Sequence, residues 1–190
     1  FADADRMGGD QQFDEMLKKT PTIIGQIPAN QTKGNPVPRG VATIGAAWQP
    51  WVYNYEGAVG PIESFAKSAI GVGMMLIAPE GDGVVRRMPL VIQIDGQLYP
   101  SLSMEILRTA AGDVSYQMKI GQGGIEALRI PKYKKIMTDA NGAVWIDFKW
   151  KTKTYSLNKL TEEELFGELD FNGKIVILSP TASGIDNPVA

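Results

Sequence analysis

Apolar residues recur at helical spacing after Pro61 and then run together without a polar break. Intervals of three and four residues predict a helix with one buried face, which comprises Ile62, Phe65, Ala66, Ala69 and Ile70. The uninterrupted run from Val72 to Ala78 predicts a strand that is buried on both faces. A helix followed directly by a buried strand is typical of an α/β domain.

The N-terminal segment shows the same order of helix and strand. Asp10 can cap a short helix before the chain meets a proline, and a strand is predicted from Thr22 to Ile27. The apolar residues of that helix, spaced three and four apart, are Phe13, Met16 and Leu17. The next segment, from Pro28 to Gly60, is rich in proline, glycine and aromatic residues, and it predicts a long, partly packed loop.

The middle of the chain carries the clearest turn signal. Asp95-Gly96 is typical of a type I′ turn, and it joins a predicted strand from Leu90 to Ile94 to the segment Gln97-Leu98-Tyr99. Val84-Val85 is predicted to be extended as well. Ser101 can then cap a helix that ends at Gly112.

The second half predicts mostly strands. A capping box of Thr161 and Glu164, with Leu160 and Leu165 as a hydrophobic staple, predicts one helix that begins at Thr161. The predicted strands are Ser115 to Ile120, Leu128 to Ile130, Ala143 to Phe148 after an Asn141-Gly142 turn, and Lys174 to Leu178 after an Asn172-Gly173 turn.

Composition narrows the fold and the chemistry. The 190 residues are 44% hydrophobic and 21% charged, which is the balance of a globular domain that can fold without crosslinks. We predict an α/β (mixed α+β) fold, a single globular domain over residues 1–190 with a central, mostly buried sheet flanked by helices. Cysteine and histidine are both absent, which excludes disulfides, thiol nucleophiles and histidine-dependent catalytic triads.

The net charge and the apolar stretches of the chain limit which partners the sequence predicts. The formal net charge is −2 without a basic block, so no nucleic-acid partner is predicted. The longest mostly apolar stretch, Ala69 to Ala78, is about half the length that spans a bilayer. Because the chain starts at Phe1 without an initiator methionine or a signal peptide, we expect it to be a piece of a longer protein.

Six residues are candidates for ligand binding. Arg86 and Arg87, which follow Asp82, could hold an anionic group or couple to another domain; alternatively, one arginine pairs with Asp82 or Glu80 while the other is solvated. The aromatic residues of the long loop either line a ligand pocket or form a lid over the core, and the candidates among them are Trp48, Trp51 and Tyr53.

No catalytic or metal constellation is predicted. Ser64 and Lys67 match a Ser-x-x-Lys motif, but the accompanying motifs of penicillin-recognising enzymes are incomplete. Asp3, Asp5 and Asp10 could supply oxygen ligands to calcium, but they follow no EF-hand pattern. We therefore expect neither a cofactor nor a metal.

Three segments, together with Gly8 to Phe13, carry a resemblance to a known family. The most specific is Pro79 to Leu90 (PEGDGVVRRMPL), which is followed by Tyr99 to Leu102 and Glu105 to Arg108. The others are Thr138 to Phe148, and Phe171 to Leu178 with Thr181 to Asp186. The chain thereby resembles the CHASE2 domain, an extracytoplasmic sensor module of bacterial signalling proteins. It departs from the family at Ser179, where a glycine is usual.

The resemblance implies a non-catalytic sensor of an unknown small-molecule or environmental stimulus. Such a domain lies on the periplasmic or extracellular side of the inner membrane, with one membrane helix before it and three after, and the full-length protein is expected to be a homodimer. The effector is a class III adenylate or guanylate cyclase, a histidine kinase or a serine/threonine kinase. The cyclase-linked form is the most similar, at Met88-Pro89-Leu90, Pro100-Ser101-Leu102 and Gly123-Gly124-Ile125.

The sequence also leaves two alternative functions open. The chain could be a free periplasmic solute-binding protein or hydrolase, which would use the loop aromatics or Ser64 and Lys67, respectively. It could also be a scaffold that only holds two protomers together. Flanking sequence would separate a sensor from a free protein, because a sensor predicts hydrophobic spans near both ends.

Overall fold

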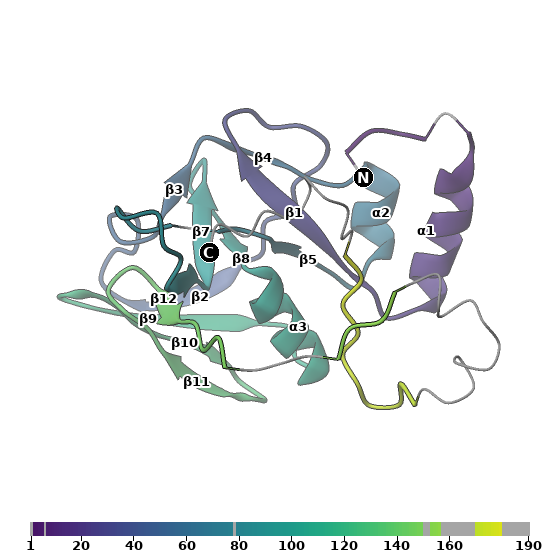
Figure 1. The fold of residues 1–190 in the computed structure, drawn as a ribbon. Coiled ribbons are helices and arrows are strands. Elements are labelled where there is room, and N and C mark those ends of the chain that lie inside the picture. Colours follow the sequence, from purple (N-terminus) through teal and green to yellow (C-terminus); the bar gives the residue numbers. More distant parts are fainter. Residues whose placement is uncertain (1, 6, 78, 150–152, 157–169, 180–190) are drawn as a thin grey trace. The chain divides into compact units, whose positions relative to one another are not determined.

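The computed structural model describes residues 2–5, 7–77, 79–149, 153–156 and 170–179. The chain divides into two compact units, residues 1–146 and 147–190, and each is described by itself. Helices and strands both occur in the first unit (Figure 1), which confirms the mixed α/β class. The predicted central sheet is wrong, because the strands of this unit form four separate sheets.

The first sheet has the order β4-β1-β5, in which β1 and β5 are parallel and β1 and β4 are antiparallel. Strand β1 (Ile23–Ala29) lies in the middle, between β4 (Gly57–Val59) and β5 (Gly71–Met74). All four residues of β5 are buried, as the apolar run predicted, but the strand ends at Met74 rather than at Ala78.

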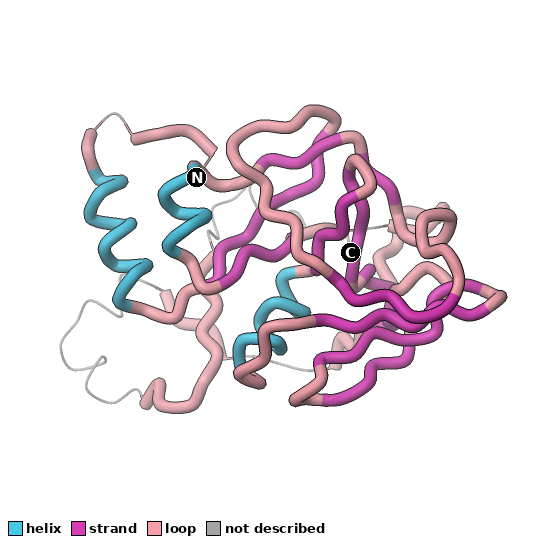
Figure 2. The backbone as a smooth tube through the Cα atoms, turned by 180° about the vertical axis from the view of Figure 1, so that it is seen from behind, coloured by secondary structure: helices cyan, strands magenta, loops and turns pink. Residues whose placement is uncertain are grey.

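Helices α1 and α2 lie side by side (Figures 1 and 2) and pack against one face of this sheet. They are Gly9–Lys19 and Glu63–Ser68, and a small core of Leu17, Ile24 and Phe65 joins them to β1. The predicted extension of α2 to Ile70 is wrong, because the chain is already extended at Ala69 as it enters β5.

The start of α1 differs from the prediction. Gly8 holds the N-cap position with a φ of 83°, and the Asp5 carboxylate accepts a hydrogen bond from the Gly9 N–H at 2.8 Å. Asp10 is therefore not the cap; its carboxylate accepts a hydrogen bond from the Asp5 N–H instead. Met16 was expected to be buried but is exposed, while Leu17 is buried.

Helix α3 (Leu102–Ala110) packs against the other face of the first sheet. Ser101 caps it as predicted, since its hydroxyl accepts a hydrogen bond from the Met104 N–H at 3.3 Å. The helix can approach closely because β5 presents glycine to it: a Cβ on Gly73 would lie 2.5 Å from Leu102 Cα.

The second sheet has the order β11-β10-β9-β2 and covers the largest core cluster. Strands β9 (Tyr116–Gly121) and β10 (Gly124–Ile130) form a hairpin, and β11 (Lys134–Met137) continues it. Strand β2 (Val41–Gly45) pairs in parallel with β9 at the opposite edge. Buried residues of β9 and β10 point into the core, namely Tyr116, Met118, Ile120, Ile125, Leu128 and Ile130.

Two small sheets complete the first unit. One pairs β6 (Arg87–Pro89) with β12 (Ala143–Trp145), and the other has the order β3 (Asn54–Tyr55), β7 (Val91–Ile94), β8 (Gln97–Pro100). The predicted type I′ turn between β7 and β8 is confirmed, since Asp95 and Gly96 both have positive φ angles of 49° and 70°.

Several predicted boundaries are wrong in these sheets. Val84-Val85 is not a strand, and β12 ends at Trp145 rather than at Phe148. The segment 28–60 is not one loop, because it contributes β2, β3 and β4. These three strands are short, and their backbone pairing to distant strands holds them in place.

In the second unit, the described residues include the predicted Asn172-Gly173 turn, where Gly173 has a φ of 66° and Lys174 N donates to Phe171 O at 3.1 Å. The predicted buried strand from Lys174 to Leu178 is wrong: this segment has no strand pairing and is exposed, up to 82% at Leu178. The helix predicted from Thr161 lies outside the described residues.

Candidate ligand site

A tight turn before β6 brings acidic side chains to the two predicted arginines. Glu80 N donates to Val84 O at 3.0 Å, and Gly83 N donates to Glu80 O at 2.8 Å. Gly83 has a φ of 81°, a conformation that glycine adopts without strain. The Asp82 carboxylate accepts from the Val84 N–H at 3.1 Å and so fixes its own position in the turn.

Both arginines are paired with carboxylates. Arg86 donates two hydrogen bonds to the Asp82 carboxylate, from Nη1 to Oδ1 at 3.0 Å and from Nη2 to Oδ2 at 2.7 Å. Arg86 Nη1 also donates to Glu80 Oε2 at 3.1 Å. Arg87 Nε donates to Glu80 Oε1 at 2.9 Å, and Arg87 Nη1 donates to Asp139 Oδ2 at 2.9 Å. The alternative in which one arginine is simply solvated is therefore wrong. We call these five residues the arginine cluster.

Asp139 joins this cluster to strand β12. Its Oδ1 accepts hydrogen bonds from the N–H groups of Asn141 and Ala143, at 3.0 and 2.9 Å, across the predicted Asn-Gly turn. Arg87 also lies over the exposed ring of Trp145, 5.5 Å from its centroid, at a cation–π distance. The cluster thus joins two chain segments, residues 80–87 and Asp139, that lie about fifty residues apart in sequence.

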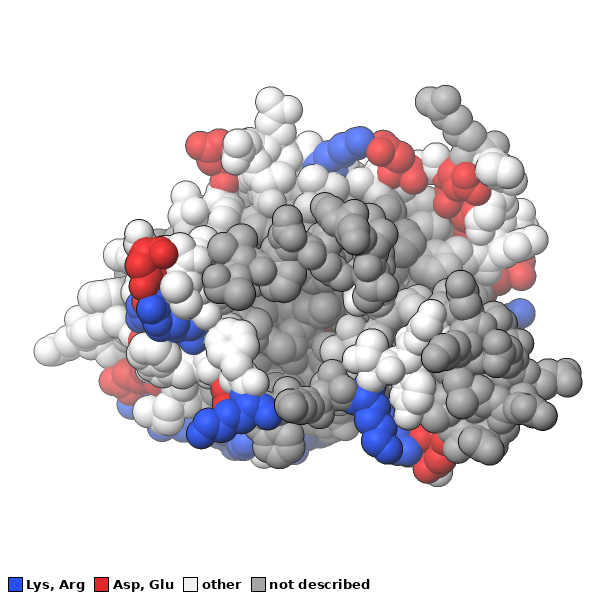
Figure 3. Space-filling model, in the orientation of Figure 1, with Lys and Arg blue, Asp and Glu red and all other residues white. Residues whose placement is uncertain are grey.

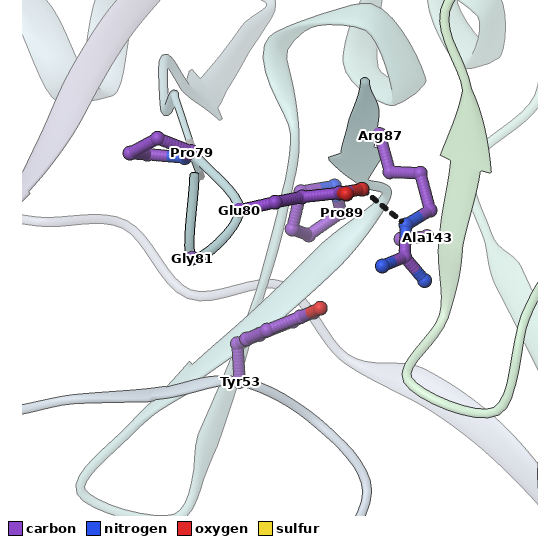
Figure 4. A pocket seen from close by; sticks show the side chains of 7 residues that line it. All are labelled: Tyr53, Pro79, Glu80, Gly81, Arg87, Pro89 and Ala143. Atoms are coloured by element: carbon purple, nitrogen blue, oxygen red, sulfur yellow. Dashed lines mark hydrogen bonds and ion pairs between the residues drawn. The ribbon is translucent and has the colours of Figure 1, made fainter. Parts of the chain in front are cut away.

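A cavity of about 200 Å³ lies beside the cluster (Figure 4). Tyr53 reaches into it from the side opposite Glu80 and Arg87. The remaining lining is apolar or small, and consists of Pro79, Gly81, Pro89 and Ala143. An aromatic ring, apolar walls and a few converging polar groups are the usual composition of a small-molecule site.

The family model described as the CHASE2 domain matches residues 1–190. The chain belongs to the CHASE2 family. No curated protein and no solved structure matches it. The CHASE2 domain is an extracytoplasmic sensory domain of signalling proteins, and this role agrees with a domain that is not itself catalytic.

Of the six residues predicted to bind a ligand, Arg87 and Tyr53 line the cavity. The other four, which are Asp82, Arg86, Trp48 and Trp51, do not. The two tryptophans pack against the largest core cluster, and Asn141 Nδ2 donates to the Trp51 carbonyl oxygen at 2.8 Å. This packing matches the lid interpretation of the loop for the tryptophans.

Sequence reasoning did not identify Asp139, Pro89 and Ala143 as parts of this site. Pro89 and Ala143 are partners in the pairing of β6 and β12, and no chemical motif marks them. Asp139 could have been found, because an aspartate two residues before an Asn-Gly turn commonly accepts backbone hydrogen bonds from that turn.

A second group of charged residues of the CHASE2 domain is buried on the inner side of α3, and Glu105 is at its centre. The side chain of Glu105 is 0% exposed and accepts hydrogen bonds from Tyr116 Oη at 2.8 Å and from Arg108 Nη2 at 2.7 Å. Arg39 Nε lies 2.7 Å from Glu105 Oε1 as an ion pair but is not aligned for a hydrogen bond. Burial raises the pKa of Tyr116 far above its ordinary value, and the charge of Glu105 raises it further.

The remaining candidates have other partners. In α2, Lys67 Nζ pairs with Glu63 at 2.5 Å, and both side chains are exposed. Asp3 pairs with Lys33 at 2.8 Å.

A second cavity, of about 370 Å³, lies between the β9–β10 turn and β11, and its only charged lining residue is Glu126.

On the face drawn in Figure 3, the basic side chains (Lys and Arg, blue) and the acidic side chains (Asp and Glu, red) are interspersed rather than gathered by sign. Among the residues that the structure describes, no helix is both long enough and apolar enough to cross a bilayer.

Replacing Arg86 by glutamine should raise the pKa of Asp82. The two hydrogen bonds from Arg86, with the Val84 N–H, lower that pKa from 3.8 to about 2. Because the folded-state pKa is the lower one, this pair stabilises the fold above pH 3.8, and the stabilisation is lost as the pH falls toward 2. Carboxyl-detected NMR titration should show the Asp82 pKa returning toward 3.8.

Arg87→Gln is the matched control, because Arg87 makes no hydrogen bond to Asp82. It should leave the pKa of Asp82 low. Equal pKa values of Asp82 in the two variants would contradict the assignment of Arg86 as the main partner.

Proposed function

We propose that this CHASE2 domain controls a class III adenylate or guanylate cyclase on the cytoplasmic side of the membrane. The observation that carries the proposal is the position of the most specific family segment, Pro79 to Leu90: it contains four of the five residues of the arginine cluster and borders the cavity. Met88-Pro89-Leu90, one of the segments similar to the cyclase-linked form, lies in β6 and directly after it.

The proposed mechanism is a shift between two arrangements of the domain. A stimulus that binds one arrangement better than the other biases the equilibrium by its difference in binding free energy, and couplings of about 1–3 kcal/mol are typical. Glu80 and Asp139 both contact Arg87, so a molecule in the cavity would act on the turn before β6 and on β12 at once. We expect the full-length protein to be a homodimer, since class III cyclases need two catalytic domains.

A histidine kinase or a serine/threonine kinase is the second candidate effector, because CHASE2 domains are linked to these enzymes as well. The domain would work in the same way, and only the reaction on the other side of the membrane would differ. Membership of a sensory family favours either effector over a free hydrolase.

The test uses the full-length protein that carries this domain, in membrane vesicles. We expect it to convert ATP or GTP to the cyclic nucleotide, and we expect a version without residues 1–190 to differ in rate. Phosphate transfer from ATP to protein without cyclic nucleotide would establish a kinase instead. An identical rate with and without the domain would overturn control by this domain.

A further inference from the structure

We propose that the cavity beside the arginine cluster binds a small zwitterion of the size of a free amino acid, with its carboxylate on Arg87 and its ammonium group on Glu80. This inference rests on the proposed function, in which the domain binds a stimulus, and it names the chemical class of that stimulus. Nothing in the family match assigns a ligand.

The volume of the cavity limits the ligand to a small molecule. At about 200 Å³ it is below the roughly 300–1,000 Å³ of pockets for drug-sized ligands. Two prolines and the methyl group of Ala143 line it, and Pro89 and Ala143 are themselves buried. These walls leave room for a short, apolar side chain next to the charged groups.

The charges of the site favour a zwitterion over a simple anion. The arginine cluster combines two guanidinium groups with the carboxylates of Glu80, Asp82 and Asp139, so one negative charge is left over. An anion would bind against this excess charge and compete with carboxylates for the arginines. A ligand with one positive and one negative group matches the neighbouring Glu80 and Arg87 without adding net charge.

Both charged residues have unused hydrogen-bonding capacity. Arg87 donates through Nε and Nη1, and its Nη2 donates to no described residue. Each oxygen of Glu80 accepts one hydrogen bond, and a carboxylate can accept about four. The carboxylates of Asp82 and Asp139, by contrast, each accept at least three hydrogen bonds. Arg87 and Glu80 are therefore the members that can take a further partner.

Tyr53 supplies the third contact. Figure 4 shows its side chain across the cavity from the Glu80–Arg87 pair. Its hydroxyl makes no hydrogen bond to a described residue, so it is free to donate to a carboxylate, and its ring can face an ammonium group. A carboxylate, a guanidinium and an aromatic ring around one small cavity together fit an α-amino acid.

The test is calorimetric titration of the 190-residue chain with three matched probes: L-alanine, propionate and ethylamine. L-Alanine carries both charged groups, and each of the others carries one. We expect L-alanine to bind at least about tenfold more tightly than either, which is the effect of losing a hydrogen bond between charged groups. Glycine and L-leucine extend the series to smaller and larger side chains.

Two variants test the assigned residues. Glu80→Gln and Arg87→Gln should each weaken L-alanine binding by about tenfold or more, whereas Glu126→Gln, which changes the second cavity, should leave it unchanged. If either variant fails to fold, the comparison of the three probes on the unaltered chain still decides the proposal.

Three results would overturn it: propionate binding as tightly as L-alanine, ethylamine doing so, or no heat of binding with any of the amino acids. The outcome is separate from that of the effector assay. Amino-acid binding without cyclase activity would leave this site standing and remove the proposed function. Cyclase control without amino-acid binding would overturn this site and leave the proposed function standing.

Discussion

Glu105→Gln should lower the free energy of unfolding by about 3–5 kcal/mol, which is the usual cost of removing one partner from a buried ion pair. The neutral amide has nearly the same shape, so the loss comes from charge and hydrogen bonding rather than from a cavity. Arg108, which is almost fully buried, would lose its charged partner and keep its hydrogen bonds to Thr109 and to the carbonyl oxygens of Ile70 and Asp113. Urea unfolding followed by circular dichroism measures this change.

Glu126→Gln is the matched control for this prediction. Glu126 pairs with Lys119 at 2.5 Å, but both side chains are about half exposed, and such a pair contributes up to about 1 kcal/mol. The same chemical change is thus made once in the interior and once at the surface. Equal losses of stability in the two variants would show that burial of Glu105 carries no special cost.

Gly73→Ala should lower the free energy of unfolding by at least about 2 kcal/mol, in the range of overpacked cores. The added Cβ would lie 2.5 Å from Leu102 Cα and 2.9 Å from Leu102 N, so α3 would have to move as a whole. A flexible side chain cannot relieve this contact because both atoms belong to the backbone. Thermal unfolding should show a lower midpoint.

Gly123→Ala separates this clash from the general effect of replacing glycine. Gly123 lies in the turn between β9 and β10, its φ is outside the left-handed region, and no atom lies within 4 Å of the added Cβ. It should change stability little or increase it slightly, since alanine restricts the unfolded chain. A loss as large as that of Gly73→Ala would contradict the assigned contact with α3.

Local signals in the sequence predicted the elements that local interactions determine. Asp95-Gly96 specifies a two-residue hairpin by backbone conformation alone, and Ser101 caps α3 with its own hydroxyl. Strand β2 was missed because it lies at a sheet edge, where most of its side chains are exposed. Its strand conformation comes from pairing with β9, which no pattern within residues 41–45 reveals.

Local sequence patterns did not reveal the true burial of two parts of the chain. The β-branched run from Lys174 to Leu178 favours extended chain, but burial requires a partner, and the described structure gives this segment none. Glu105 and Arg108 are spaced like an ordinary exposed pair on a helix, yet both are buried. Their partners Arg39 and Tyr116 come from distant segments, so only the fold brings them together.

For the candidate site, the sequence supplied the charged residues and the structure supplied their arrangement. Asp82 and the two arginines stood out as a short charged motif. The cavity could not be predicted, because its lining comes from distant parts of the chain: Tyr53 precedes β3, Glu80 lies in the turn before β6, and Ala143 belongs to β12.

The parallel pairing of β2 with β9 also constrains how the chain acquires its structure. Val41 pairs with Tyr116, so β2 must wait for a partner that is synthesised long after it, while the β7–β8 hairpin can close through a two-residue turn within microseconds. During that interval the backbone groups of β2 that will pair with β9 stay open to other chains. A domain that matures outside the cytoplasm therefore depends on the export of residues up to β9 before this side of β2 is protected.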